Sequence, residues 1–176
     1  MIPNRISVSE RPRTAELNHA EGDLFVSPRS AETLASVALV CLPDVQLLVG
    51  RKMINRKPKT MVKTMKKIER EVILDTLTLD NGIENKEHEQ FGVATYFCDP
   101  RSPWQKPHIE NSIGLLRRWF LPKGTDLSKV SERDLQKYIS VLNHKYRKSL
   151  GYRSAYEIAI GRGILKTKQP LRVALH

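Results

Sequence analysis

The sequence has few cysteines and no long hydrophobic run. Its two cysteines, Cys41 and Cys98, are far apart and outside any Cys-x-x-Cys pattern, so the spacing of a zinc knuckle or a disulfide framework is missing. No stretch approaches the roughly 20 apolar residues that span a bilayer. The N-terminal segment is polar and has no apolar core of the signal-peptide kind. We therefore expect a cytoplasmic protein that neither crosses nor enters a membrane.

Acidic residues are scarce relative to basic ones. Among 176 residues there are 30 Lys and Arg but only 19 Asp and Glu, which gives a formal net charge of +11. Such an excess favours a polyanionic partner, with nucleic acid first and an anionic membrane surface second. A soluble protein that is merely basic would have the same charge, so charge alone does not decide between them.

Aromatic residues make up only 6% of the chain. RNA-binding modules stack bases on aromatic side chains, so this scarcity argues against a stand-alone RNA-binding or ribosome-associated protein. We expect Trp104 and Trp119 to anchor the core or a loop rather than to stack on bases. His108 stands alone in a loop, where a histidine is more often neither a metal ligand nor a proton shuttle.

The order of predicted strands and helices indicates a mixed α/β domain. Runs rich in Val and Leu at 24–27, 34–42 and 45–52 predict three antiparallel strands joined by turns. The segment 75–82 predicts a fourth strand, which ends at an Asn-Gly turn, and 93–98 predicts a fifth. The residues before His19 are polar and predict an extended arm that carries no core.

Helices are predicted between and after these strands. Pro58 opens a helix with an apolar stripe; the stripe consists of Met61, Met65, Ile68 and Val72. A short helical piece is expected at 85–92, followed by amphipathic helices at 108–120 and from Ser131 to about Leu150, and a weak one at 155–161. The predicted order is β-β-β-α-β-α-β-α-α.

Three acidic residues fall where this layout brings side chains together. Asp23 lies in the first strand, Asp80 at the end of the fourth, and Glu110 on the helix after the fifth. If the first and fourth strands are neighbours, the two aspartates converge and the helix lays Glu110 across them. Carboxylates suit Mg²⁺ or Mn²⁺. Many triples can be drawn from nineteen acids, however, so Glu110 as an ordinary surface residue stays an open alternative.

Several motifs together resemble one protein family. They are ISVSERP at 6–12, EGDL at 21–24, DNGIE at 80–84, YFCDPRSPWQKPHIENSIGLLRRWFLPKGTDLS at 96–128 and LNHKYRKSLGYRSAYEI at 142–158. In this order they resemble the catalytic domain of insertion-sequence-30 family transposases, and the resemblance covers roughly residues 6 to 160. The long motif in the second half of the chain is the most specific.

The resemblance implies a fold, a site and a reaction. The fold is a ribonuclease-H-like integrase core, a mixed sheet of about five strands flanked by helices. Its three catalytic carboxylates fall on Asp23, Asp80 and Glu110 and are expected to hold two Mg²⁺ or Mn²⁺ ions. The implied reaction is DNA strand cleavage followed by strand transfer, acting on transposon ends and target DNA, with a homo-oligomer joining two ends. The alternative is a decayed remnant that only binds DNA.

Five residues on or beside the helix at 108–120 are candidate DNA contacts: Lys106, Asn111, Arg117, Arg118 and Lys123. Arg117 lies seven residues after Glu110 and shares its face of the helix, so it is expected to reach a phosphate near the metal ions.

The sequence also departs from the family pattern. The 29 residues between Asp80 and Glu110 are about one helical turn fewer than is usual for the family. Either a shorter helix keeps the register or Glu110 is displaced. We expect an N-terminal arm at 1–19, a catalytic core at 20–150 and a basic extension at 151–176.

Overall fold

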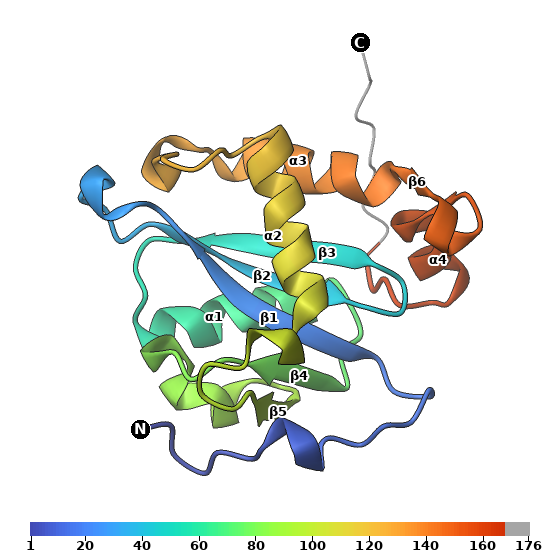
Figure 1. Cartoon of the computed structure of the whole chain (residues 1–176), viewed down its shortest axis with the longest axis horizontal. Coiled ribbons are helices and arrows are strands. Elements are labelled where there is room, and N and C mark those ends of the chain that lie inside the picture. The colour runs from blue at the N-terminus through green and yellow to red at the C-terminus, as the bar shows by residue number, and fades with distance from the viewer. Residues whose placement is uncertain (168–176) are drawn as a thin grey trace.

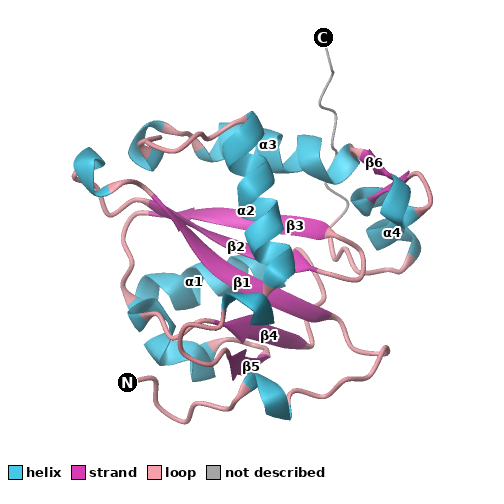
Figure 2. Cartoon of the chain, in the orientation of Figure 1, coloured by secondary structure: helices cyan, strands magenta, loops and turns pink. Residues whose placement is uncertain are grey.

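The computed structural model describes residues 1–167, so the end of the predicted basic extension, residues 168–176, lies outside the described residues. Its centre is a five-stranded mixed sheet, drawn in magenta in Figure 2. The strands are β1 (His19–Val26), β2 (Ser36–Leu42), β3 (Leu47–Met53), β4 (Thr76–Leu79) and β5 (Ala94–Phe97), in the order β3-β2-β1-β4-β5. Strands β1, β2 and β3 pair antiparallel, and β4 runs parallel to both β1 and β5.

Helices cover both faces of the sheet (Figure 1). Helix α1 (Pro58–Glu69) packs on one face, and α2 (Pro107–Trp119) and α3 (Glu132–His144) pack on the other. All seven residues of β2 are buried because alternate side chains enter opposite layers: Val40 faces the α1 layer and Leu39 the α2 layer. Helix α4 (Ala155–Gly161) completes the α1 layer at one end.

Shorter elements join these. The 3₁₀ segments are η1 (Val8–Glu10), η2 (Arg29–Ala31), η3 (Ile83–Gln90), η4 (Pro103–Gln105), η5 (Leu127–Lys129) and η6 (Lys148–Leu150), and β6 (Tyr146–Arg147) pairs with β7 (Arg153–Ser154). No helix in the described part of the chain is both long and apolar enough to cross a bilayer.

The predicted elements are confirmed in kind, with different limits. Strand β1 begins at His19 rather than at residue 24. Its first residues, 19–21, pair with β4, and residues 21–26 pair with β2. Helix α3 ends at His144 rather than near Leu150, because the β6–β7 hairpin begins at Tyr146. The helical piece expected at 85–92 is the 3₁₀ segment η3, which starts at Ile83.

The prediction that the N-terminal arm carries no core is wrong. Ile2 is only 7% exposed and belongs to the α1-side core. The arm lies along β5, where the Phe97 amide donates to the Ile6 carbonyl at 2.8 Å. Strand β5 is the last strand of the sheet and has β4 as its one strand partner in the sheet order, so the arm covers an edge that would otherwise be open.

The predicted domain boundaries stay a prediction. Within the described residues, the segment after 150 contributes Ala155, Ala159 and Ile164 to the same core as the sheet. The Ile73 amide also donates to the Ile164 carbonyl at 2.9 Å, so this segment is tied to the chain before β4.

Candidate active site

Strands β1 and β4 bring Asp23 and Asp80 to the same level of the sheet. Their parallel register pairs Glu21 with Thr78, and two residues further along each strand come Asp23 and Asp80. The side chain of Asp80 is fixed by local hydrogen bonds, since it accepts from the Gly82 amide at 3.1 Å and from the Asn85 amide group at 3.3 Å. The Asn-Gly turn that ends the strand therefore also orients the carboxylate.

Helix α2 adds Glu110 to the same place. Asp23, Asp80 and Glu110 all line one open pocket of about 420 Å³, together with the loop that follows β5. Both aspartates are half-buried, whereas Glu110 is exposed at the pocket. Despite the shorter connection between Asp80 and Glu110, Glu110 lines the same pocket as the two aspartates.

A lysine ammonium lies between the two aspartates. Lys106 Nζ is 3.0 Å from Asp23 Oδ2 and 3.8 Å from Asp80 Oδ2, and it donates to the Gly22 carbonyl at 3.2 Å. The lysine side chain is only 6% exposed. A buried ammonium needs such partners, because an unpaired buried charge is costly. The pocket therefore already holds one positive charge between Asp23 and Asp80.

Glu21 fixes the start of α2 against β1. This buried carboxylate accepts from the Ile109 amide at 2.8 Å and contacts His108 Nδ1 at 2.8 Å. The helix has no side-chain cap from its own N-cap residue, so Glu21 satisfies a backbone amide at the positive end of the helix dipole. Sequence reasoning missed this role, although Glu21 stands two residues before Asp23 and so shares its face of β1.

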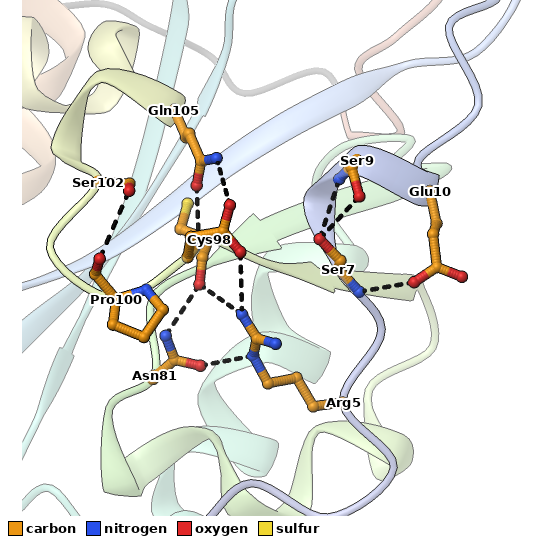
Figure 3. Close-up of polar contacts among 10 residues, drawn as sticks. Arg5, Ser7, Ser9, Glu10, Asn81, Cys98, Pro100, Ser102 and Gln105 are labelled. Atoms are coloured by element: carbon orange, nitrogen blue, oxygen red, sulfur yellow. Dashed lines mark hydrogen bonds and ion pairs between the residues drawn. The ribbon is translucent and has the colours of Figure 1, made fainter.

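The N-terminal arm holds the loop beside the pocket (Figure 3). Arg5 donates to Asn81 Oδ1 and to the Cys98 carbonyl, both at 2.8 Å, and Asn81 donates to the same carbonyl at 2.9 Å. Gln105 clamps the loop from its other end, because it accepts from the Asp99 amide at 2.7 Å and donates to the Asp99 carboxylate at 3.0 Å. The loop that leads to Lys106 is thereby tied to the residue after Asp80.

Glu84 is a further carboxyl group near the two aspartates. Burial raises its pKa above the usual value, and the negative charges of Asp80 and Asp23 raise it further, against its own backbone hydrogen bond and the charge of Arg56. The upward shift of the Glu84 pKa reflects in part the negative field of Asp80 and Asp23, and such a field favours cations.

The predicted DNA contacts divide into three groups. Asn111, Arg118 and Lys123 are exposed. Arg117 lies 5.2 Å over the Phe25 ring and lines a second pocket of about 290 Å³, together with Lys123, rather than the pocket of the aspartates. Lys106 is buried in the ion pair described above, so its ammonium is not free at the surface in this structure.

Of the two alternatives expected for the tryptophans, an anchor in the core or in a loop, the core is wrong for both. Trp104 is 71% exposed and Trp119 is 55% exposed. Lys145 Nζ lies 4.4 Å from the centre of the Trp119 ring, and the Arg118 guanidinium lies 5.7 Å from it. The apolar stripe of α2 is satisfied by Ile109 and Leu116, which leaves Trp119 on the solvent side.

The carboxylates have the right donor atoms for a hard divalent cation, but they are not arranged closely enough to hold one. Their oxygen donors are those that Mg²⁺ and Mn²⁺ prefer, and a cation is already accepted between Asp23 and Asp80 in the form of the Lys106 ammonium. Among residues 1–167, however, no group of three or more His, Cys, Asp or Glu side chains is close enough to hold a metal ion.

The fold is that of a retroviral integrase core. The catalytic core domain of BIV integrase matches 83% of this chain over 95% of its own length, with a TM-score of 0.60 and 14% sequence identity. A chain of the simian T-cell lymphotropic virus intasome in complex with PP2A regulatory subunit B56 gamma matches 84% of this chain, with a TM-score of 0.62. The predicted ribonuclease-H-like fold class is confirmed.

Sequence comparison gives more specific relatives. The chain is 34% identical over 175 residues to the transposase for insertion sequence element IS1086 of Cupriavidus metallidurans, a match that covers 89% of this chain. It is 31% identical over 162 residues to the IS4351 transposase of Bacteroides fragilis, and 42% identical over 96 residues to transposase InsI for IS30A of Escherichia coli K12, which covers 52% of this chain and 24% of that protein. The predicted resemblance to insertion-sequence-30 family transposases is confirmed.

The match concerns part of each relative. The chain spans about half the length of the IS1086 and IS4351 transposases, 48% in both cases. No protein-family model matches the chain.

Proposed function

We propose that this chain is the catalytic region of a DNA transposase, with Asp23, Asp80 and Glu110 as its catalytic carboxylates. The observation that carries the proposal is one pocket lined by all three residues, which come from β1, from the end of β4 and from the start of α2. The transposase relatives support the reaction class.

The proposed reaction has two steps. A water oxygen attacks a phosphodiester at the end of the element, and the 3′ oxygen leaves as a hydroxyl. That hydroxyl then attacks a phosphodiester of target DNA and releases the 3′ oxygen of the target strand. Both steps form and break one phosphorus–oxygen bond, so one site can perform both.

Mg²⁺ or Mn²⁺ is the proposed cofactor. When bound, such ions make the attacking oxygen more nucleophilic and stabilise the leaving oxygen. Asp23 and Asp80, which are now paired with the Lys106 ammonium, would hold the ion, and Glu110 would complete the set from the first turn of α2. Since the Lys106 ammonium lies between the two aspartates, it would have to be displaced for these carboxylates to hold an ion. Glu21 keeps the first turn of α2 in place throughout.

DNA is the proposed partner, both as element ends and as target. Asn111, Arg118 and Lys123 are exposed beside α2 and are proposed to contact the backbone, and Arg117 to contact it at the second pocket. Lys106 can join them once its ammonium is released. A homo-oligomer is proposed because two element ends must be joined.

A cleavage assay tests the proposal. Glu110→Gln and Asp80→Asn are each expected to abolish Mg²⁺-dependent or Mn²⁺-dependent cleavage of a labelled duplex, while the Kd for DNA changes little. Glu16→Gln, which alters an exposed carboxylate of the arm, is the matched control and should cleave like the wild type. Unchanged cleavage by Glu110→Gln would rule out its assignment.

A second candidate function is a decayed transposase that binds DNA without chemistry. It is favoured by the lack, in residues 1–167, of a carboxylate group close enough to hold a metal ion. It predicts salt-sensitive, sequence-indifferent DNA binding without cleavage. Calorimetric Mn²⁺ titration of the wild type beside Asp80→Ala separates the two, because only an assembled site loses Mn²⁺ binding in the variant.

A further inference from the structure

Helix α1 presents one face to the core and a row of positive charges to solvent. Met61, Met65 and Ile68 are buried against the sheet. The exposed cations of the helix and of the residue that follows it are Lys59, Lys63, Lys66, Lys67 and Arg70. At 3.6 residues per turn these five fall within an arc of about 100°. We call this row the α1 basic stripe.

The stripe works against the stability of the helix that carries it. Lys59 and Lys63, and likewise Lys66 and Arg70, are like charges at i and i+4, which destabilise a helix by about 0.2–0.5 kcal/mol per pair. The first turn has no acidic residue to match the helix dipole. Glu69, the one acid in the helix, accepts from the Gly92 amide at 2.9 Å. No described ion pair involves the stripe.

The length and charge of the stripe match a nucleic-acid backbone. From Lys59 to Arg70 the helix rises by about 16 Å, and one strand of a DNA duplex has a phosphate about every 3.4 Å along its axis. Five cations therefore lie along roughly five phosphates. Two copies that met stripe to stripe would set like charges against each other, which argues against a dimer contact of that kind.

The stripe lies on the other side of the sheet from the candidate DNA contacts of α2. Helix α1 lies on one face of the sheet and helices α2 and α3 on the other (Figure 1), and their buried residues belong to two separate hydrophobic clusters. We propose that the α1 basic stripe binds the phosphate backbone of a second DNA duplex segment, independently of its sequence, while another segment occupies the carboxylate pocket. The inference rests on the proposed function for DNA as the partner.

Two variants with equal charge loss test the inference. The stripe variant carries Lys59→Gln, Lys63→Gln, Lys66→Gln and Lys67→Gln. The control variant carries Arg13→Gln, Lys86→Gln, Arg133→Gln and Lys137→Gln, at exposed positions elsewhere. The Kd for a duplex of about 30 base pairs is measured at several salt concentrations. A contact to Z phosphates contributes about −0.9Z to the slope of log K against log salt concentration. The magnitude of this slope should therefore fall by about 3–4 in the stripe variant and by less than 1 in the control.

Two other results of these measurements would overturn the inference. Equal losses in the two variants would mean that only net charge matters. An unchanged DNA slope together with lost binding to phosphatidylserine vesicles would assign the stripe to a membrane surface. Thermal unfolding checks the fold, and the stripe variant should be at least as stable as the wild type because like-charge pairs are removed. An absence of cleavage in the wild type would contradict the proposed catalytic function and leave the stripe result standing.

Discussion

Replacing Lys106 by Met is expected to tighten the binding of Mn²⁺ and to destabilise the metal-free protein. The ammonium lies 3.0 Å from Asp23 and 3.8 Å from Asp80, and the lysine side chain is only 6% exposed. Met keeps much of the length and apolar volume of the lysine stem but removes the charge. The variant therefore frees the space that the ion would take and leaves two neighbouring carboxylates without their cation.

The size of the effect follows from the ion pair. At an effective dielectric constant of about 20, charges 3.0 Å apart attract by roughly 5 kcal/mol. Rehydration of the released ammonium offsets about half of this, and Asp80 adds little because its side chain is 47% exposed. A remaining cost of about 2–3 kcal/mol corresponds to a roughly 30- to 140-fold gain in Mn²⁺ affinity for the variant. The metal-free variant should lose stability of the same order, about 3 kcal/mol.

Calorimetric or paramagnetic Mn²⁺ titration measures the affinity, and thermal unfolding with and without Mn²⁺ measures the linked stability. Mn²⁺ should raise the Tm of the variant by more than it raises that of the wild type. Lys123→Met, at an exposed lysine of the second pocket, is the control and should bind Mn²⁺ as the wild type does. Acylation of Lys106 in the wild type gives a second readout, because displacement by Mn²⁺ should make the amine more reactive. Protection of Lys106 by Mn²⁺, or no tighter Mn²⁺ binding by Lys106→Met, would show that the lysine does not occupy the position of the ion.

Three further predictions concern the framework of the site. Glu21→Ala should lower the free energy of unfolding by about 2–3 kcal/mol in urea titrations, since a buried amide loses its charged acceptor, and Glu21→Gln should restore at least half. Burial raises the pKa of the Cys41 thiol to about 11. The free energy of unfolding should therefore be unaffected by this thiol below pH 9 and should fall by about 2–3 kcal/mol as the pH rises to 11. The same fall in Cys41→Ala would contradict this. Gly50→Ala should cost about 1–3 kcal/mol, because a Cβ there would lie 2.5 Å from Leu39 Cδ2 and 3.1 Å from Ile139 Cδ1; an unchanged Tm would show that the core gives way easily.

Local patterns in the sequence predicted most of the elements. The apolar run at 34–42 predicted the strand that is β2, and Pro58 is the first residue of α1 as expected. Ser131 caps α3, since its hydroxyl accepts from the Asp134 amide at 3.0 Å. These features depend on neighbours within a few residues, which is the range over which helix and strand periodicity applies.

Contacts between distant residues were beyond such patterns. The buried place of Lys106 depends on Asp23 and Asp80, and the buried place of Ile2 depends on the open side of β5. From sequence neighbours alone, a lysine beside a proline-rich loop is expected to be exposed to solvent. The same holds for a polar N-terminal segment. The three predicted carboxylates line one pocket, as the sequence led us to expect, but the sequence did not predict the Lys106 ammonium between Asp23 and Asp80.

The short connection between Asp80 and Glu110 shows why spacing along the chain was a poor guide to the site. Asp80 is fixed by the end of β4, and the first turn of α2 is fixed by Glu21 of β1 through the Ile109 amide. Both ends of the connection are therefore set by the pair of neighbouring strands β1 and β4, and residues 83–90 between them form the 3₁₀ segment η3. A change in the length of this connection can leave the carboxylates in place, whereas loss of the Glu21 contact would move Glu110 with no change in spacing.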